Sequence, residues 1–172
     1  MSDASDQADD QADIGQDIEA RHFRNVLGHF ATGVTAVTAM NESRPVGMAI
    51  GSFTSVSLDP PLVAFLPTKD SSSWGDIRAA GCFCVNVLAQ DQMATCGVMA
   101  SRAADKFADI AWRPGSTGAP IIDGSVAYIE CTIENVYDGG DHDIVVGRVV
   151  EMDVLAAKAP MLFWKGGYGT FA

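Results

Sequence analysis

Hydrophobic and polar residues alternate over several short stretches of the chain, a period of two that is typical of β-strands. Where a continuous apolar run replaces the alternation, a strand buried on both faces is expected. Together these patterns predict strands over residues 34–40, 46–53, 62–66, 82–88, 125–137, 143–155 and 161–164. Turn residues lie between the first two, at 41–45, and between the two longest, at 138–141, so each pair is expected to form a hairpin.

Two further segments have helical patterns in the first half of the chain. A spacing of i, i+3, i+4 and i+7 predicts an amphipathic helix over residues 21–30, with the apolar residues Phe23, Val26, Leu27 and Phe30. A short helix that contains Trp74 is expected to follow one of the serines 71–73 as its N-cap and to end at Gly81.

The middle of the chain adds one more helix and a loop. Residues 91–102 are predicted to be helical, with an inner side drawn from Met93, Cys96, Val98 and Met99. Residues 113–120 contain two Pro and two Gly and are expected to form a loop. The total is about six strands and two or three helices with hairpin-like links. This pattern predicts a mainly β fold, a closed or nearly closed antiparallel barrel with peripheral helices.

The charge distribution divides the chain of 172 residues, which is long enough for one domain with a core. Residues 1–20 hold no Lys or Arg and seven of the 22 acidic residues: Asp3, Asp6, Asp9, Asp10, Asp13, Asp17 and Glu19. We therefore expect a disordered acidic tail over 1–20 and one domain over 21–172. The domain carries more acidic than basic residues, which disfavours nucleic-acid binding. Its aliphatic run at 62–66 is too short to cross a membrane.

The four cysteines, Cys82, Cys84, Cys96 and Cys131, form no C-x-x-C pair, and the chain has three histidines. A structural zinc site is therefore not expected, and we predict no metal. The N-terminus has no basic segment followed by an apolar one, so no secretion signal is predicted. These features favour a reducing, cytoplasmic location.

The common cofactor and catalytic motifs are absent from the sequence. It contains neither the G-x-G-x-x-G of a dinucleotide-binding βαβ unit nor a P-loop. It also contains no H-E-x-x-H and no G-x-S-x-G. Composition and spacing alone therefore support no more than a β-barrel-like domain.

Several strings, in their order from about residue 21 to 170, resemble the flavin reductase family, and within it the reductase components of two-component flavin monooxygenases. The chain contains Leu27-Gly28-x-Phe30-x-Thr32-Gly33-Val34-Thr35, Ser52-Phe53-Thr54-Ser55-Val56-Ser57-Leu58-Asp59-Pro60-Pro61, Pro67-Thr68-Lys69-x-Ser71-x-Ser73-Trp74, Asp105-Lys106-Phe107 and Asp138-Gly139-Gly140-Asp141-His142. Each string is short, and their joint order and spacing make the resemblance specific.

The resemblance implies an FMN-binding split barrel, a six-stranded antiparallel Greek-key barrel with peripheral helices. Such proteins are usually homodimers that use NADH or NADPH to reduce FMN or FAD. The hydride passes from nicotinamide C4 to flavin N5, and the reduced flavin diffuses to a partner monooxygenase. The sequence distinguishes neither FMN from FAD nor NADH from NADPH, and it does not identify the partner.

The resemblance also implies a set of site residues, beginning with the strand beside the flavin ring. In the family the backbone of this strand hydrogen-bonds the ring, which makes candidates of Gly47, Met48, Ala49, Ile50, Gly51 and Ser52. Many members read Thr-Ala-Ser-Ser before the Phe, where this chain reads Ala-Ile-Gly-Ser, so two hydroxyls are missing. The alternative is an ordinary core strand.

A phosphate-binding loop is implied next, with the candidates Pro67, Thr68, Lys69, Ser71, Ser72, Ser73 and Trp74. Lys69 would supply a charge, the serines would supply hydroxyl donors, and the following helix would supply backbone N–H groups. Asp70 is expected to point away. The alternative is a helix cap beside a solvated lysine.

A second flavin-contacting segment is implied by Ala100, Ser101, Arg102 and Lys106. Arg102 or Lys106 would meet a phosphate or an adenylate tail. The alternatives are a surface arginine and a local salt bridge between Asp105 and Lys106.

His142 is the catalytic candidate, because the family places this histidine near the nicotinamide and the flavin. It would bond the carboxamide or stabilise the negative charge of the reduced flavin near N1. A C-terminal segment is expected to border the nicotinamide pocket, with Phe163, Trp164, Lys165, Gly166 and Tyr168 as candidates.

Two other functions stay open at this point. The first is a flavin-binding module without reductase turnover, which the altered segment at 49–51 keeps open. The second is a split-barrel protein that takes a deazaflavin or a haem-type ligand, which the loop at 69–74 and the Asp141-His142 pair disfavour.

Overall fold

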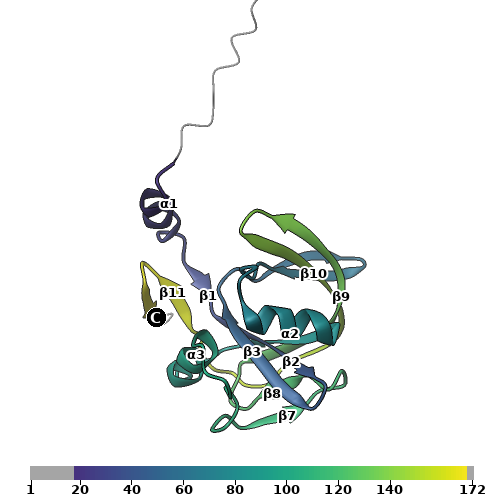
Figure 1. Cartoon of the computed structure of the whole chain (residues 1–172). Helices are drawn as coiled ribbons and strands as arrows, with labels where there is room; N and C mark the ends of the chain where they lie inside the picture. Colours follow the sequence, from purple (N-terminus) through teal and green to yellow (C-terminus); the bar gives the residue numbers. More distant parts are fainter. Residues whose placement is uncertain (1–17, 170–172) are drawn as a thin grey trace, which may run out of the picture.

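The structure is a computed structural model that describes residues 18–169 (Figure 1). Its helices are α1 (Ala20–Leu27), α2 (Ser72–Ala80) and α3 (Met93–Ala100). Its strands are β1 (Thr32–Gly33), β2 (Thr35–Asn41), β3 (Arg44–Ile50), β4 (Thr54–Leu58), β5 (Pro61–Phe65), β6 (Cys82–Val87), β7 (Trp112–Pro114), β8 (Pro120–Ile122), β9 (Ala127–Gly139), β10 (His142–Val154), β11 (Leu162–Trp164) and β12 (Gly167–Gly169). Most of the predicted acidic tail lies outside the described residues, so the division into tail and domain stays a prediction. None of the three helices is long and apolar enough to span a membrane.

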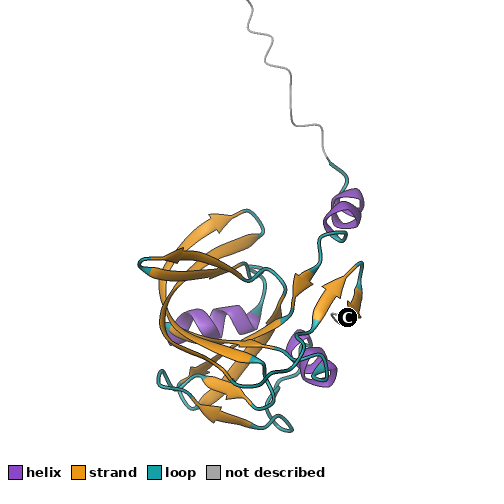
Figure 2. Ribbon diagram, turned by 180° about the vertical axis from the view of Figure 1, so that it is seen from behind, coloured by secondary structure: helices purple, strands orange, loops and turns teal. Residues whose placement is uncertain are grey.

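A seven-stranded antiparallel sheet forms the body of the fold, in the order β3-β2-β6-β9-β10-β5-β4. The sheet curls around α2, and β3 and β4 form its two edges (Figure 2). Two small sheets, β1-β11-β12 and β7-β8, lie beside it. The mainly β fold is confirmed, with α1 and α3 peripheral and α2 inside the curl of the sheet (Figure 2). The described strands outnumber the predicted ones because β1, β7, β8 and β12 have two or three residues each, too few to show a period, and because β4 was not predicted.

Both predicted hairpins are present. The pairing of β2 with β3 reaches Asn41 and Arg44 and leaves a two-residue turn. The pairing of β9 with β10 reaches Gly139 and His142, and Gly140 has a φ of 81°. Glycine adopts this left-handed conformation without steric cost, which permits the tight turn. The second hairpin therefore carries His142 at its tip.

The predicted short helix is α2, and it packs into the main core. The Ser71 hydroxyl accepts a hydrogen bond from the Trp74 backbone N–H at 3.3 Å, and Gly81 ends the helix with a φ of 71°. Trp74 and Ile77 are 3% and 0% exposed. The Trp74 ring meets the Phe65 ring edge-on, with centroids 5.8 Å apart. The cap and the buried face together hold the start of α2 against the sheet.

The inner side of α3 is narrower than the sequence predicts. Cys96 and Met99 are buried, whereas Met93 and Val98 are 55% and 36% exposed. The inclusion of Met93 and Val98 was wrong because the helix only begins at Met93, and residues two apart, such as Cys96 and Val98, do not share a helix face.

The predicted amphipathic helix is α1, but it contains no buried residue. It stands beside the body of the fold (Figure 1), and Phe23, Val26 and Leu27 are each more than half exposed. The helix ends at Leu27, so Phe30 lies beyond it and is 74% exposed. The apolar side of α1 is therefore open to solvent in the single chain.

The predicted loop over 113–120 is partly a hairpin, since β7 and β8 pair Arg113 with Ile121 and Pro114 with Pro120. The turn of this hairpin wraps a buried carboxylate, that of Glu130 on β9. A side chain on Gly115 would collide with this carboxylate. Glycine at position 115 therefore lets the backbone of the turn approach the Glu130 carboxylate closely.

Glu130 is fully buried and accepts four hydrogen bonds from the turn. Ser116 donates its backbone N–H at 2.7 Å and its hydroxyl at 2.8 Å, and Thr117 donates the same groups at 3.0 and 2.5 Å. Burial raises the pKa of the Glu130 carboxyl, but these donors outweigh burial and bring the pKa below its ordinary value.

We expect Glu130→Gln to reduce the free energy of unfolding at pH 7 by about 2–4 kcal/mol, because donors that matched a carboxylate are left buried beside an amide. A lowered folded-state pKa stabilises the fold above the ordinary Glu pKa and is lost as pH falls through the folded-state value. The loss of stability on acidification should therefore be smaller in the variant, as measured by urea unfolding at several pH values.

The matched control is Glu134→Gln on the same strand, which removes an exposed ion pair to Arg148 and should cost less than about 1 kcal/mol. Equal losses in the two variants would contradict the role assigned to Glu130.

Candidate functional site

A main cavity of about 630 Å³ lies between β3, the start of α2 and the segment that follows α3. Ten of the residues singled out in the sequence line it, and they are Met48, Ala49, Thr68, Ser71, Ser72, Ser73, Ala100, Ser101, Arg102 and Lys106. They come from three separate stretches of chain. The tertiary structure therefore brings together the predicted ring strand, phosphate loop and second contact segment.

An apolar hollow of about 220 Å³ adjoins the main cavity, because Ala49 lines both. Five of its lining residues were predicted, namely Ala49, Ile50, Gly51, Phe163 and Tyr168. Val34 and Cys96 complete it and were not predicted as site residues, although their apolar strand and helix patterns place them in the core. The Phe163 and Tyr168 rings pack edge-on, with centroids 5.4 Å apart, and form one wall.

The first turn of α2 presents backbone donors to the main cavity. Trp74 and Gly75 donate their N–H groups to Ser71, so the N–H groups of Ser72 and Ser73 are the ones that an anion could take. The Ser71 hydroxyl serves as the helix cap. Of the serine hydroxyls predicted to bind phosphate, that of Ser71 therefore caps α2 instead.

Lys106 joins three walls of the main cavity. Its ammonium donates to the carbonyl oxygens of Gly47 and Met99, each at 2.9 Å, and to the Ser73 hydroxyl at 3.2 Å. Burial lowers the pKa of Lys106 from its ordinary value. The expected alternative, a salt bridge to Asp105, is absent from the described part, where Asp105 instead accepts the Phe107 N–H at 2.9 Å.

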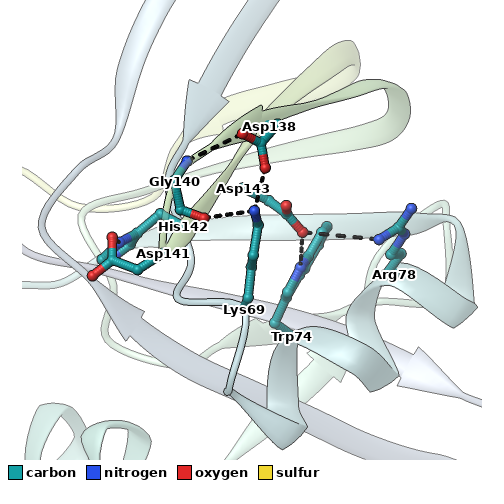
Figure 3. Close-up of polar contacts among 8 residues, drawn as sticks. All are labelled: Lys69, Trp74, Arg78, Asp138, Gly140, Asp141, His142 and Asp143. Carbon is teal, nitrogen blue, oxygen red and sulfur yellow. Dashed lines mark hydrogen bonds and ion pairs between the residues drawn. The ribbon is translucent and has the colours of Figure 1, made fainter.

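Lys69 points toward the tip of the β9–β10 hairpin, and the main cavity does not include it (Figure 3). Its ammonium pairs with the Asp138 carboxylate and donates to the Gly140 carbonyl at 2.6 Å. The hydrogen bond to Asp138 raises the pKa of Lys69. This arrangement favours a role for Lys69 in holding the hairpin tip over the predicted direct contact with a phosphate.

Asp70 lines the main cavity, which corrects the expectation that it points away. Lys69 and Asp70 lie in a turn that follows the bridge between Thr68 and His142, and the Ser71 N–H closes this turn by donating to the Thr68 carbonyl at 3.1 Å. From this turn, Lys69 is directed to the hairpin tip and Asp70 lines the cavity.

His142 does not line the main cavity, but its backbone pairs with that of Thr68, which does. Its Nδ1 lies 2.7 Å from an oxygen of Asp141, as Figure 3 shows, and its side chain is 42% exposed. The hydrogen bond with His142 lowers the pKa of Asp141. The carboxylate therefore orients the ring.

Trp74 turns its ring away from the cavity, so only its backbone lies at the site. Its Nε1–H donates to Asp143 at 2.8 Å, and Arg78 lies 3.8 Å from the same oxygen (Figure 3). Asp143 is 8% exposed and was not predicted from the sequence. Asp143 follows His142 directly and occupies an inward-facing position of β10, and this pattern is the sequence signal that could have identified it. This hydrogen bond ties the first turn of α2 to the start of β10.

The remaining predicted residues surround the site without lining the main cavity. Ser52 links the end of β3 to Leu66 through its hydroxyl, and Pro67 accepts the Asp143 N–H at 3.0 Å. Trp164 and Lys165 turn toward the end of α1, where they donate to His29 and Gly28, and Gly166 lies in the same turn. Over residues 18–169, no group of three or more His, Cys, Asp or Glu side chains could hold a metal ion.

The chain matches the profile of the flavin reductase like domain over residues 27–172. It is 48% identical over 159 residues to the reductase subunit HsaB of a flavin-dependent monooxygenase from Rhodococcus jostii, covering 92% of this chain and 82% of that protein. A nitrilotriacetate monooxygenase component B homologue from Mycobacterium thermoresistibile is 50% identical, with a TM-score of 0.86 and coverage of 88% and 86%. The NADH:FAD oxidoreductase of Streptomyces globisporus, solved with NAD and FAD fragments, is 41% identical, with a TM-score of 0.84 and coverage of 88% and 92%.

We expect Trp74→Phe to lower the free energy of unfolding by about 1–3 kcal/mol, because the ring remains but the donor to the buried Asp143 is lost. Circular dichroism during urea unfolding would measure this change. Trp112→Phe is the matched control, since no hydrogen bond of the Trp112 side chain is found within residues 18–169. A loss in the control as large as that in Trp74→Phe would mean that the Asp143 contact contributes nothing.

Proposed function

The chain belongs to the flavin reductase like domain family, and we propose that it reduces FMN or FAD with NADH or NADPH. The observation that carries this proposal is the meeting of the main cavity and the apolar hollow at Ala49, along one face of β3. A flavin has the same division, an aromatic ring system at one end and a phosphate at the other. The site offers apolar surface for the first and donors and cations for the second.

The residues present fit such a ligand. Ala49, Ile50 and Gly51 present small or apolar groups to the hollow where the ring would lie, and the backbone of β3 would supply its hydrogen bonds. The N–H groups of Ser72 and Ser73 would hold the phosphate, with Arg102 as the nearby cation. Lys106 would hold β3, α2 and the end of α3 in place around the ligand and would not bind the phosphate directly, because its ammonium already makes three hydrogen bonds.

The bound flavin supplies the atom that accepts the hydride, and the protein supplies position and charge. Phe163 and Tyr168 would cover the apolar hollow and exclude water from it. His142, oriented by Asp141 beside Thr68, would hydrogen-bond the nicotinamide carboxamide or the reduced flavin near N1. Lys69 would contribute by fixing the hairpin tip that carries His142. No protein acid or base is required for the transfer itself.

The product, a reduced flavin, is proposed to leave for a partner monooxygenase. The support is the similarity to the HsaB reductase subunit and to a homologue of component B of nitrilotriacetate monooxygenase, which are named as a subunit and a component of monooxygenases. We propose NADH as the nucleotide of first choice, since the Streptomyces relative is an NADH:FAD oxidoreductase, and NADPH as the alternative. The free thiols of Cys82, Cys84, Cys96 and Cys131 support a reducing compartment such as the cytoplasm.

A homodimer would cover the apolar side of α1. Phe23, Val26 and Leu27 are 53%, 51% and 54% exposed, and Trp164 at the neighbouring hairpin is 51% exposed. A surface of this kind is more typical of an interface than of a monomer. We therefore propose that a second copy of the chain packs on this side.

The purified protein should oxidise NADH or NADPH only when FMN or FAD is added, as measured by the loss of nicotinamide absorbance. His142→Ala should lower kcat by about tenfold or more, because the ring that hydrogen-bonds the nicotinamide or the reduced flavin is lost. Flavin binding without nucleotide oxidation, with any of the four pairs, would instead indicate a binding module.

The control for this variant is His22→Ala, which removes an exposed imidazole from α1 and should leave kcat unchanged. Equal kcat values for His142→Ala and the wild type would show that His142 does not contribute to the reaction, and they would not contradict the reductase proposal.

Sedimentation equilibrium should give a mass of about twice the 18.1 kDa of one chain. The double variant Phe23→Asp, Leu27→Asp should shift the mass to that of the monomer, because charges would be buried in the interface. Met93→Asp, at an equally exposed apolar position on α3, should remain dimeric. A monomeric wild type would refute the dimer.

A further inference from the structure

The β11–β12 hairpin supplies Phe163 and Tyr168 to the apolar hollow, and few contacts hold it against the body of the fold. β12 has three residues and is the edge strand of its small sheet, with β11 as its neighbour. The tip of the hairpin is tied to the end of α1 through hydrogen bonds donated by Trp164 and Lys165. Because α1 contains no buried residue, this tie does not fix β12 relative to the hollow.

A hydrogen bond between Cys96 and Tyr168 joins the free edge of the hairpin to α3. The Cys96 thiol donates to the Tyr168 hydroxyl, with the sulfur and oxygen atoms 3.3 Å apart. Among the hydrogen bonds of residues 18–169, this is the one that links β12 to a part of the chain other than β11. Both side chains line the hollow, and they are 1% and 43% exposed. The bond therefore reaches from the buried side of the hollow to its more exposed wall.

The helix that carries Cys96 is fixed at its other end by Lys106. The Lys106 ammonium donates to the Met99 carbonyl in the last turn of α3 and to the Gly47 carbonyl on β3, each at 2.9 Å. Cys96 and Met99 are both buried in the same apolar cluster. The short edge strand β12 is thus attached, through one side chain, to a helix that is itself held against β3.

We propose that Cys96 is a positioning residue for the flavin ring and acts through Tyr168. The thiol fixes the Tyr168 ring beside the hollow that Ile50 and Gly51 line, so that this wall is in place before the ligand binds. A wall that is already ordered lowers the entropic cost of binding. Without the bond, Tyr168 has to be ordered when the ring enters, and the affinity for flavin falls. The inference rests on the proposed function, which places the flavin ring in this hollow.

Isothermal titration of the full-length protein with oxidised FMN and with oxidised FAD tests this role independently of turnover. Tyr168→Phe removes the acceptor and keeps the ring, whereas Cys96→Ala removes the donor. Each should weaken flavin binding by about three- to tenfold, which is the usual contribution of one hydrogen bond. The double variant should lose no more affinity than either single variant, because both changes remove the same bond. Cys96→Ser keeps a donor on a side chain of similar size and should bind flavin within about twofold of the wild type.

Steady-state turnover gives a second readout of the same variants. Tyr168→Phe and Cys96→Ala should raise the KM for flavin and change kcat less than about twofold, since the bond acts on binding and makes no contact with the transferred hydride. The matched controls are Tyr137→Phe on β9 and Cys82→Ala on β6, which line neither cavity. Each control should change flavin affinity less than about twofold.

Additive losses in the double variant would overturn the proposal, as would a Tyr168→Phe variant that binds both flavins like the wild type. Tyr168 is half-exposed, so Tyr168→Phe leaves the fold intact and decides the question even if Cys96→Ala fails to fold. If the losses are coupled but neither flavin supports nucleotide oxidation, the positioning role stands and the reductase function fails. If nucleotide is oxidised and all variants bind flavin equally, the reductase function stands and the positioning role fails.

Discussion

The three hydrogen bonds of the Lys106 ammonium hold together the walls on which the site depends. β3 is an edge strand of the curled sheet, so its outer side has no neighbouring strand to fix it. Lys106 reaches from the segment after α3 to the Gly47 carbonyl on β3, to the Met99 carbonyl at the end of α3 and to the Ser73 hydroxyl on α2. A half-buried cation is stable here because three acceptors replace its water. The cavities along β3 exist because this contact spaces the three elements.

A second set of polar contacts relates the start of α2 to the hairpin tip. The Trp74–Asp143 hydrogen bond fixes the helix against β10, and the Lys69–Asp138 pair fixes the neighbouring loop against the tip. In Figure 3, His142 and Asp141 lie together to one side of both contacts. The start of α2 and His142 are thus parts of one framework. Each depends on charges from distant parts of the chain.

Ala49 and Gly51 stand where many family members have Thr and Ser, and this difference has a structural counterpart. These positions border an apolar hollow closed by the Phe163 and Tyr168 rings, so the ring end of the groove is apolar and its phosphate end is charged. This polarity along β3 orients a ligand that has one aromatic end and one anionic end. The reductase proposal follows from this polarity.

The sequence by itself determined the elements whose signals are local. The period of two, the Gly140 turn and the Ser71 cap depend on neighbours within a few residues, and they specified both hairpins and α2. Together with the motifs of the family they also identified most of the residues that line the main cavity. Only the tertiary structure decided where the charged side chains point. Lys69 turned to Asp138, Lys106 turned to backbone carbonyls, and Glu130 was enclosed by a turn, because each partner lies far along the chain or is brought close only by the folded sheet. A short-range pattern specifies backbone conformation, whereas an ion pair depends on distances that exist only after folding.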